Sequence, residues 1–495
     1  MQEYETLAAI DLGSNSFHLQ VGRVDGDQLY YLDAHKEAVR LAGGLTADKQ
    51  LDEASQKRAL DCLARFGDRL KGMPPGAVRA VGTSALRVAK NSEAFLAKAR
   101  QVLGFDIEIV AGREEARLIY LGVSHSLPGS EETRLVVDIG GGSTECILGV
   151  GYEPRERESL RMGCVVFSNQ FFPGGMVDKA SMKAAETAAR IEVQGVARQF
   201  RQGLWQEAVG SSGSAKALGE ILFQNKLADG HITAEGLTWL RERLIRAGDV
   251  NKLALPGLKP ERKPVLPGGF VIMHVLFQEL GIERMEPAQG AMREGILWDL
   301  LGRVHDQDMR AVTVSQLLRR YHVDGKQARR VERLALTLCK QIRHVLREDE
   351  EVALARLGWA AKLHEVGIGI AHSGYHKHGA YIVENADMPG FSRRDQSRLA
   401  ALVRSSRGGL DKLLLDADYT DWPLILCLRL AVLFNMSRSD DQPMPRMTLA
   451  CGPRECELRL PEDWLKTNTL TRSALEQELK TWRAAAPWLR LCAVT

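Results

Sequence analysis

Short apolar runs alternate along the first part of the chain with longer segments in which apolar residues recur every three or four positions. Residues 7–10 and 17–24 predict two strands around a short turn, and residues 78–81 predict a short buried strand. The apolar spacing of residues 53–70 predicts a helix between them. Strands and helices that alternate in this way indicate an α/β architecture.

One local pattern occurs twice. Residues 8–16 read Ala-Ala-Ile-Asp-Leu-Gly-Ser-Asn-Ser, and residues 136–143 read Val-Val-Asp-Ile-Gly-Gly-Gly-Ser. Their aspartates, Asp11 and Asp138, lie about one domain length apart. A solenoid would repeat every 20–50 residues or so, so this repeat indicates two related domains.

The character of the sequence changes near residue 306, where glycine becomes rare and helical patterns rich in Leu, Arg and Ala begin. Near the C-terminus, residues 447–451 and 456–460 predict two short strands, and residues 473–484 predict a helix. We therefore expect two α/β domains, a helical domain and a small C-terminal α/β element. Their expected bounds are 1–130, 131–305, 306–440 and 441–495.

The composition is that of a globular protein. Of the 495 residues, 45% are apolar and 26% are charged, which excludes a disordered or collagen-like chain. The first residues are acidic where a secretory signal would be basic, and no apolar run is long enough to span a bilayer. We expect a cytoplasmic protein and leave open a peripheral position on the inner membrane.

Eight cysteines are scattered along the chain, and none forms a C-x-x-C pair or a Cys/His cluster with zinc spacing. We therefore expect reduced and mostly buried thiols. They are Cys62, Cys146, Cys164, Cys339, Cys427, Cys451, Cys456 and Cys492.

The net charge is only +3, but residues 319–347 contain nine basic residues against two acidic ones. Such a run is either the solvated face of a helix or a track for a polyanion. We expect no nucleic-acid partner. The candidate track residues are Arg319, Arg320, Arg329, Arg330 and Arg333.

The two repeated segments are candidate anion-binding loops. Small residues let backbone N–H groups approach an anion, and Ser and Asn side chains add donors. The first loop alone is more typical of an ordinary hairpin turn. The second is followed by a strand and lacks Gly-Lys-Ser/Thr, which excludes a Rossmann fingerprint and a Walker A loop. The candidate phosphate-binding residues of the two loops are Gly13, Ser14, Asn15, Ser16, Gly140, Gly141, Gly142 and Ser143.

Carboxylates flank the loops and begin a further helix. The second loop lies between Asp138 and Glu145, both hard oxygen ligands for a divalent metal. Glu114 and Glu115 fall in the first turn of a helix that follows a predicted strand at residues 107–110. Acids are favoured there by the helix dipole alone, or one of them is a general base on water.

Taken together, these motifs resemble the exopolyphosphatase and guanosine pentaphosphate phosphohydrolase family of the actin-like superfamily. The resemblance also rests on Gly-Arg-Glu-Glu-Ala-Arg-Leu at 112–118, Arg-Met-Gly-Cys at 161–164, the Gly/Ser cluster at 210–214 and Gly-Ala-Met-Arg-Glu-Gly at 290–295. It implies two actin-like (ribonuclease H-fold) domains with the active site between them. It also implies an HD-like helical domain, a small C-terminal domain and a homodimer.

The resemblance implies that Glu115 is the catalytic base and that Asp138 and Glu145 help to hold Mg²⁺, with Asp11 as a further acid near the metal. Dependence on K⁺ is left open. Further phosphate contacts are implied for Arg87, Ser211, Ser212, Gly213 and Lys216. In the helical domain, His364-Glu365 stands where an HD domain carries His-Asp, and we expect these residues to be structural or to belong to the substrate track.

Several features favour inorganic polyphosphate as the substrate over guanosine pentaphosphate. They are the Gly-Gly-Gly-Ser form of the second loop, Lys216, and residues 173–175 and 372–376. We therefore expect magnesium-dependent, processive release of terminal orthophosphate from polyphosphate. Guanosine pentaphosphate hydrolysis, a sensor with little turnover and an ATP-dependent kinase are the alternatives.

Overall fold

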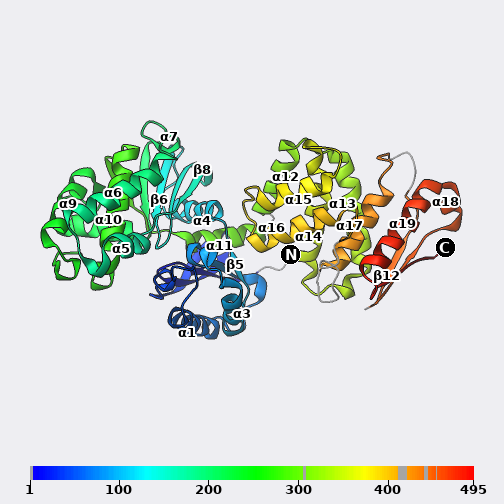
Figure 1. The fold of residues 1–495 in the computed structure, drawn as a ribbon, viewed down its shortest axis with the longest axis horizontal. Helices are drawn as coiled ribbons and strands as arrows, with labels where there is room; N and C mark the ends of the chain where they lie inside the picture. Colours follow the sequence, from blue (N-terminus) through cyan, green and yellow to red (C-terminus); the bar gives the residue numbers. More distant parts are fainter. Residues whose placement is uncertain (1–3, 305–307, 411–420, 440–443, 453, 495) are drawn as a thin grey trace. The chain divides into compact units, whose positions relative to one another are not determined.

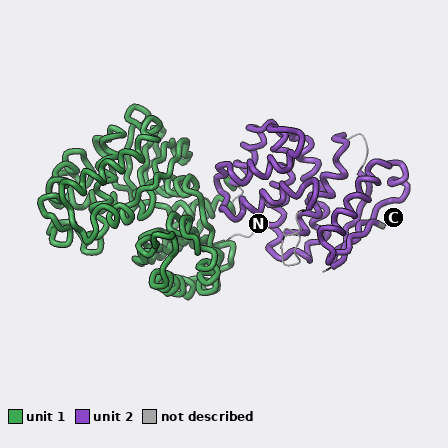
Figure 2. Tube along the Cα trace, in the orientation of Figure 1, with its two compact units in different colours: residues 1–309 green, residues 310–495 purple. Residues whose placement is uncertain are grey.

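The computed structural model describes residues 4–304, 308–410, 421–439, 444–452 and 454–494. They form two compact units, Met1–Met309 and Arg310–Thr495 (Figure 2). The domain boundaries expected at 305/306 and 440/441 fall on residues outside this description.

The first unit begins with a five-stranded sheet in the order β3-β2-β1-β4-β5. This sheet belongs to the blue part of the ribbon, where β5, α1 and α3 are labelled (Figure 1). Strands β1, β2 and β3 are antiparallel neighbours, and β4 and β5 continue the sheet in parallel with β1. The strands and the helix predicted in this region are confirmed. The elements are β1 Thr6–Leu12, β2 Phe17–Asp25, β3 Gln28–Glu37, α1 Glu53–Arg69, β4 Val78–Gly82, α2 Ser84–Val88, α3 Ser92–Leu103 and β5 Ile107–Ile109.

A six-stranded sheet follows in the order β10-β11-β9-β6-β7-β8. It repeats the start of the first sheet, because β6 runs through a Gly/Ser turn into the antiparallel β7 as β1 runs into β2. Helices α5 to α10 belong to this part of the chain. The elements are β6 Thr133–Ile139, β7 Thr144–Val150, β8 Glu153–Leu160, α5 Cys164–Phe171, α6 Lys179–Gln194, α7 Ala197–Phe200, β9 Glu207–Ser211, α8 Ser212–Gln224, β10 Ile232–Thr233, α9 Ala234–Ala247, α10 Leu266–Leu280 and β11 Arg284–Pro287.

Two helices, α4 (Gly112–His125) and α11 (Met292–Val304), pack against each other and join the two sheets. Helix α4 lies on β7 and β8, whereas α11 lies on β1 and β2 although it follows the second sheet in the sequence. A Cβ on Gly295 would lie 1.7 Å from the Leu118 carbonyl oxygen, and a Cβ on Gly122 would lie 2.0 Å from that of Ala291. Only glycine allows this approach of the two backbones.

A buried ion network supports the same helix pair. The Asp299 carboxylate of α11 lies 2.6 Å from Nη1 of Arg79 and also pairs with Arg117 of α4. Burial favours the neutral form of Asp299, but the guanidinium groups of Arg117, Arg79 and Arg303 outweigh it and hold the pKa of this carboxyl well below its usual range. Because every charge has a partner, the network fixes α11 against both β4 and α4.

The second unit is helical, with a three-stranded sheet in the order β12-β13-β14 near its end. The strands expected at 447–451 and 456–460 and the helix expected at 473–484 are confirmed. None of the described helices is long and apolar enough to cross a bilayer. The elements are α12 Met309–Arg320, α13 Gly325–Gln341, α14 Glu350–Leu363, α15 Tyr375–Asn385, α16 Arg393–Ser405, α17 Trp422–Phe434, β12 Thr448–Cys451, β13 Glu455–Arg459, α18 Glu462–Thr467, α19 Thr469–Ala485 and β14 Arg490–Val494.

The expectation of reduced thiols is wrong for one pair of cysteines. Cys451 and Cys456 form a disulfide, because the β12–β13 hairpin places them directly opposite each other with their Cα atoms 4.1 Å apart. The sequence shows that the two cysteines are five positions apart, but it does not show that β12 and β13 pair in the register that places them opposite each other. The other thiols are free, and all of them except Cys492 are buried.

We expect Gly295→Ala to lower the free energy of unfolding by about 2–3 kcal/mol, because the added methyl group would push α4 and α11 apart. The urea midpoint followed by circular dichroism measures this loss. Gly43→Ala is the matched control, since a Cβ there meets no atom within 4 Å. Equal midpoints for the two variants would contradict the close crossing.

Candidate active site

A cavity of about 550 Å³ in the first unit gathers most of the predicted site residues. Residues of both sheets line it, which brings together positions that lie far apart in the sequence. Arg87, Glu145 and Ser211 are not among the described residues that line it. The predicted residues that do are Asp11, Gly13, Ser14, Asn15, Ser16, Glu115, Asp138, Gly140, Gly141, Gly142, Ser143, Ser212, Gly213 and Lys216.

The two repeated loops touch each other at this cavity. A Cβ on Gly141 would lie 3.1 Å from the backbone nitrogen of Asn15, and a Cβ on Gly142 would lie 2.8 Å from Oγ of Ser84. Neither glycine has a positive φ angle, so the loop needs glycine for its close approach to the first domain. The loop from one sheet thus closes against the loop from the other.

The Arg-Met-Gly-Cys segment, residues 161–164, packs against the second loop. At the start of α5, the backbone N–H groups of Cys164 and Val165 donate to the carbonyl oxygens of Gly140 and Gly141 at 2.9 and 3.1 Å. A Cβ on Gly163 would lie 2.4 Å from the carbonyl oxygen of Gly141. The glycine of this motif therefore holds the loop in place without touching the cavity itself.

The third Gly/Ser cluster begins α8 and ties it to the end of β6. The hydroxyl groups of Ser212 and Ser214 both donate to the Ile139 carbonyl oxygen, at 3.0 and 3.1 Å. The Ser211 hydroxyl donates instead to the carbonyl oxygen of Gly290. Ser212 and Gly213 therefore face the cavity, while Ser211 links this cluster to the segment before α11.

The helix pitch separates the two adjacent acids at the start of α4. Glu115 lines the cavity, and its Oε2 lies 2.7 Å from Nη1 of Arg87. The carboxylate of Glu114 instead pairs with Arg117 at 2.8 Å and joins the buried network around Asp299. Of these two glutamates, only Glu115 is therefore placed to act on a molecule in the cavity.

Asp11 and Asp138, at the ends of β1 and β6, are buried beside Glu115. Burial raises the pKa of Asp11 to about 8, and the charges of Glu115 and Asp138 add to this while Arg293 opposes it. Burial likewise raises the pKa of Asp138 to about 6, although hydroxyl groups of Ser211 and Ser212 favour its charged form.

Glu145 stands on β7 directly opposite Asp138 and lies behind the cavity wall. Burial, together with the charges of Glu115 and Asp138, holds the pKa of Glu145 well above its usual range. The Ser159 hydroxyl of β8 donates to its Oε1 at 2.8 Å. Ser159 was not predicted as a site residue. It lies in a segment rich in charged residues, and nothing in that local pattern distinguishes this serine.

This donor set fits a divalent metal. Among the described residues, Oδ1 of Asp11 is buried without a hydrogen-bond partner, and the negative charges of Glu115 and Asp138 act on this carboxyl. No three His, Cys, Asp or Glu side chains of the described residues form a ready-made metal cage. Mg²⁺ usually takes only one or two protein carboxylates and completes its shell with water and substrate phosphates.

Basic side chains also line the cavity, and the sequence did not single most of them out. Lys36 comes from β3, Arg262 from the 3₁₀ segment Pro260–Val265, and Arg293 from the start of α11. Burial and the charge of Arg293 lower the pKa of the neighbouring His18 to about 3, so this imidazole is neutral at physiological pH. Of Lys36, Arg262 and Arg293, only Arg293 belongs to a motif that the sequence analysis used, the segment 290–295.

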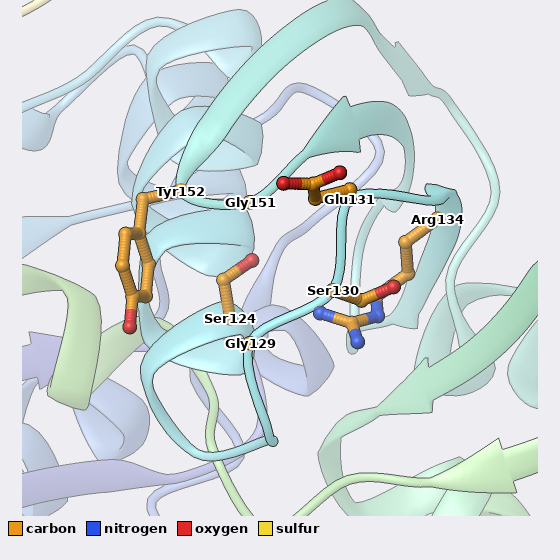
Figure 3. Close-up of a pocket in the computed structure, with 7 residues that line it drawn as sticks. All are labelled: Ser124, Gly129, Ser130, Glu131, Arg134, Gly151 and Tyr152. Atoms are coloured by element: carbon orange, nitrogen blue, oxygen red, sulfur yellow. The ribbon is translucent and has the colours of Figure 1, made fainter.

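A second cavity, of about 250 Å³, lies at the other end of α4 (Figure 3). Ser124, Arg134 and Tyr152 are among its lining residues, and Arg134 is already paired with Glu207 at 2.8 Å. None of the predicted site residues lines it. The larger cavity is therefore the candidate active site.

Two family models match the sequence. That of the Ppx/GppA phosphatase family covers residues 20–304. The chain belongs to this family. The model of Ppx/GppA phosphatase domain III matches residues 309–479 of the same phosphatase. Glu115 and the second and third Gly/Ser segments fall within the first match, and the first loop lies just before it.

Solved structures support the fold of this Ppx/GppA phosphatase. An exopolyphosphatase from Cytophaga hutchinsonii is 23% identical, with a TM-score of 0.55 over 60% of this chain and 98% of that one. The Ppx/GppA family member of Aquifex aeolicus is also 23% identical, with a TM-score of 0.51 over 60% and 98% of the two chains. The phosphatase has two α/β sheets with their helices, followed by a helical region and a small α/β element.

The predicted polyphosphate track lies in the second unit of the phosphatase. On α12 and α13, Arg319, Arg320, Arg329 and Arg333 are exposed, while Arg330 is partly buried and donates to the carbonyl oxygen of Arg438. These positions suit a solvated face as well as a track, so the track stays a prediction.

The His364-Glu365 pair lies in the same helical region. His364 is fully buried, and its Nδ1 lies 2.6 Å from the Ala361 carbonyl oxygen. The Glu365 carboxylate pairs with Arg438. Both side chains thus have structural neighbours within the helical core.

We expect Mg²⁺ binding to the phosphatase to release about one proton per ion at pH 7. Without metal, the Asp11 carboxyl keeps its proton below its pKa of about 8, and it must lose that proton to bind a cation. At pH 9 the proton is already gone and the release should vanish. Titration calorimetry in two buffers of different ionisation enthalpy measures the difference. Asp11→Asn should remove most of it, and equal binding heats in both buffers at pH 7 would contradict the assignment.

Proposed function

We propose that this Ppx/GppA phosphatase is an exopolyphosphatase that releases terminal orthophosphate from inorganic polyphosphate with the help of Mg²⁺. One observation carries the proposal: two Gly/Ser loops, one from each actin-like domain, meet at a cavity that also contains Glu115. Paired loops of this kind can hold the phosphates on either side of one anhydride bond.

In the proposed reaction, Glu115 takes a proton from a water molecule as the water oxygen attacks the terminal phosphorus. A new P–O bond forms, the bridging P–O bond breaks, and the shortened chain leaves with the electron pair as a phosphate oxyanion. The backbone N–H groups and hydroxyls of the loops stabilise the negative charge that develops on the phosphoryl oxygens. Glu115 then passes its proton to solvent.

Asp11 and Asp138 would hold Mg²⁺ together with the substrate, and Glu145 would support them from behind the cavity wall. When bound, the ion neutralises and orients the phosphates. It would also stabilise the charged forms of Asp11 and Asp138, which burial disfavours.

The lining of the cavity favours an inorganic chain over a nucleotide. Lys36, Lys216, Arg262 and Arg293 suit a repeating polyanion. Of the described residues that line the cavity, none is Phe, Tyr or Trp, the side chains on which a nucleobase usually stacks. The guanosine pentaphosphate alternative would share the same loops, because its 5′ end is also a phosphoanhydride.

The substrate is tested by phosphate release from long-chain polyphosphate and from guanosine pentaphosphate, at matched concentrations of terminal phosphate and with Mg²⁺. We expect faster release from polyphosphate. Faster release from the nucleotide would replace the proposed substrate and leave the role of Glu115 unchanged. Phosphate transfer from ATP only when an acceptor is added would indicate a kinase instead.

We expect Glu115→Gln to lower kcat for phosphate release by about 10³-fold, because the amide cannot accept the proton of the attacking water. Glu53→Gln is the matched control, since Glu53 is an exposed acid in the first turn of α1. That variant should keep full activity. Unchanged turnover in Glu115→Gln would exclude the proposed base, and negligible turnover in the unmodified protein would favour a sensor.

A further inference from the structure

We infer that Arg87 is a positioning residue that holds the Glu115 carboxylate, and that it is not a phosphate contact. This inference rests on the proposed function. It differs from the role that resemblance implied, in which Arg87 touches the phosphates. Three observations support it: the contacts of the guanidinium group, its place outside the cavity lining, and the charges that surround Glu115.

The guanidinium group of Arg87 joins two elements at one nitrogen. Nη1 lies 2.7 Å from Oε2 of Glu115 and 3.0 Å from the carbonyl oxygen of Val110. Val110 directly follows strand β5, and Glu115 lies in the first turn of α4. A charged donor shared by these two acceptors fixes the side chain of Glu115 relative to the strand behind it.

Arg87 reaches Glu115 from outside the cavity. It projects from the short helix α2, and it is absent from the described residues that line the cavity, whereas Glu115 and Thr83 are present. Only 11% of its side chain is exposed. Its Nη2 lies 3.8 Å from where a Cβ of Gly112 would stand, so the guanidinium group lies against the start of α4. A phosphate in the cavity would meet Glu115 before it met Arg87.

The two carboxylate oxygens of Glu115 therefore differ in their contacts. Oε2 is held by Arg87, while Oε1 has no hydrogen bond or ion pair within the described residues and belongs to a side chain that lines the cavity. A carboxylate held at one oxygen keeps the other pointed at the attacking water. Placement of this kind matters, because a displacement of about 1 Å can cost 10²-fold in rate.

The neighbouring acids show why Glu115 needs this partner. Its charge acts on Asp11, which is half-buried, and on Asp138 and Glu145, which are buried. Arg87 supplies a cation on the side of Glu115 away from the cavity. Loss of Arg87 would remove both of these contacts and leave Glu115 beside three acids without its ion-pair partner.

Kinetics of phosphate release by Arg87→Ala, Arg87→Lys and Lys216→Ala test the inference. For Arg87→Ala we expect kcat to fall about 10²-fold while KM changes less than about threefold. Guanidinium ion added at millimolar concentration should restore part of kcat, and Arg87→Lys should keep a larger part of it. Lys216→Ala, which changes a lining residue, should instead raise KM.

Substrate binding by the inactive variant gives a second test that does not depend on turnover. We expect Glu115→Gln and Glu115→Gln/Arg87→Ala to bind polyphosphate with the same Kd within about twofold, and to share the same residual rate. Because the double variant removes both members of the Arg87–Glu115 pair, neither charge is left buried without the other, and circular dichroism verifies that the variant folds. A Kd that rises tenfold or more with loss of Arg87, or a raised KM with kcat retained, would overturn the inference. Failure of the unmodified protein to hydrolyse polyphosphate would count against the proposed function alone.

Discussion

The close crossing of α4 and α11 is the constraint on which the active site depends. These helices lie back to back between the two sheets, and Gly122 and Gly295 let their backbones approach to a distance that any side chain would prevent. The Asp299 ion network then fixes the pair against β4. Because Glu115 stands in the first turn of α4, this packing decides where the proposed catalytic base lies relative to both Gly/Ser loops.

A second consequence of this arrangement is a concentration of like charge. Four acids, Asp11, Glu115, Asp138 and Glu145, gather around one cavity, and burial together with their like charges raises the pKa values of Asp11, Asp138 and Glu145. The basic side chains around the same cavity do not pair with these acids. A polyphosphate chain bound with Mg²⁺ would complement both sets at once, so the substrate and its ion balance charges that the protein leaves apart.

Local pattern was enough to predict much of this molecule. The alternation of apolar residues placed β1, β2, β4 and α1, and the repeated Asp-containing motif indicated two related domains. Local pattern failed where a contact depends on which strands pair and in which register. The β12–β13 register pairs Cys451 with Cys456, and Ser159 becomes a partner of Glu145 because β8 lies beside β7. No spacing within one segment contains that information.

The sequence by itself determined the chemistry present: two small-residue loops, the acids beside them and a pair of glutamates at a helix start. Those features are local, because turn geometry and helix periodicity depend on neighbouring residues. Only the tertiary structure decided the role of each residue. It turned Glu115 toward the cavity and Glu114 toward Arg117, and it set Arg87 against Glu115. Which face of α4 meets which sheet depends on contacts between residues far apart in the chain, and these exist only after the two domains have packed.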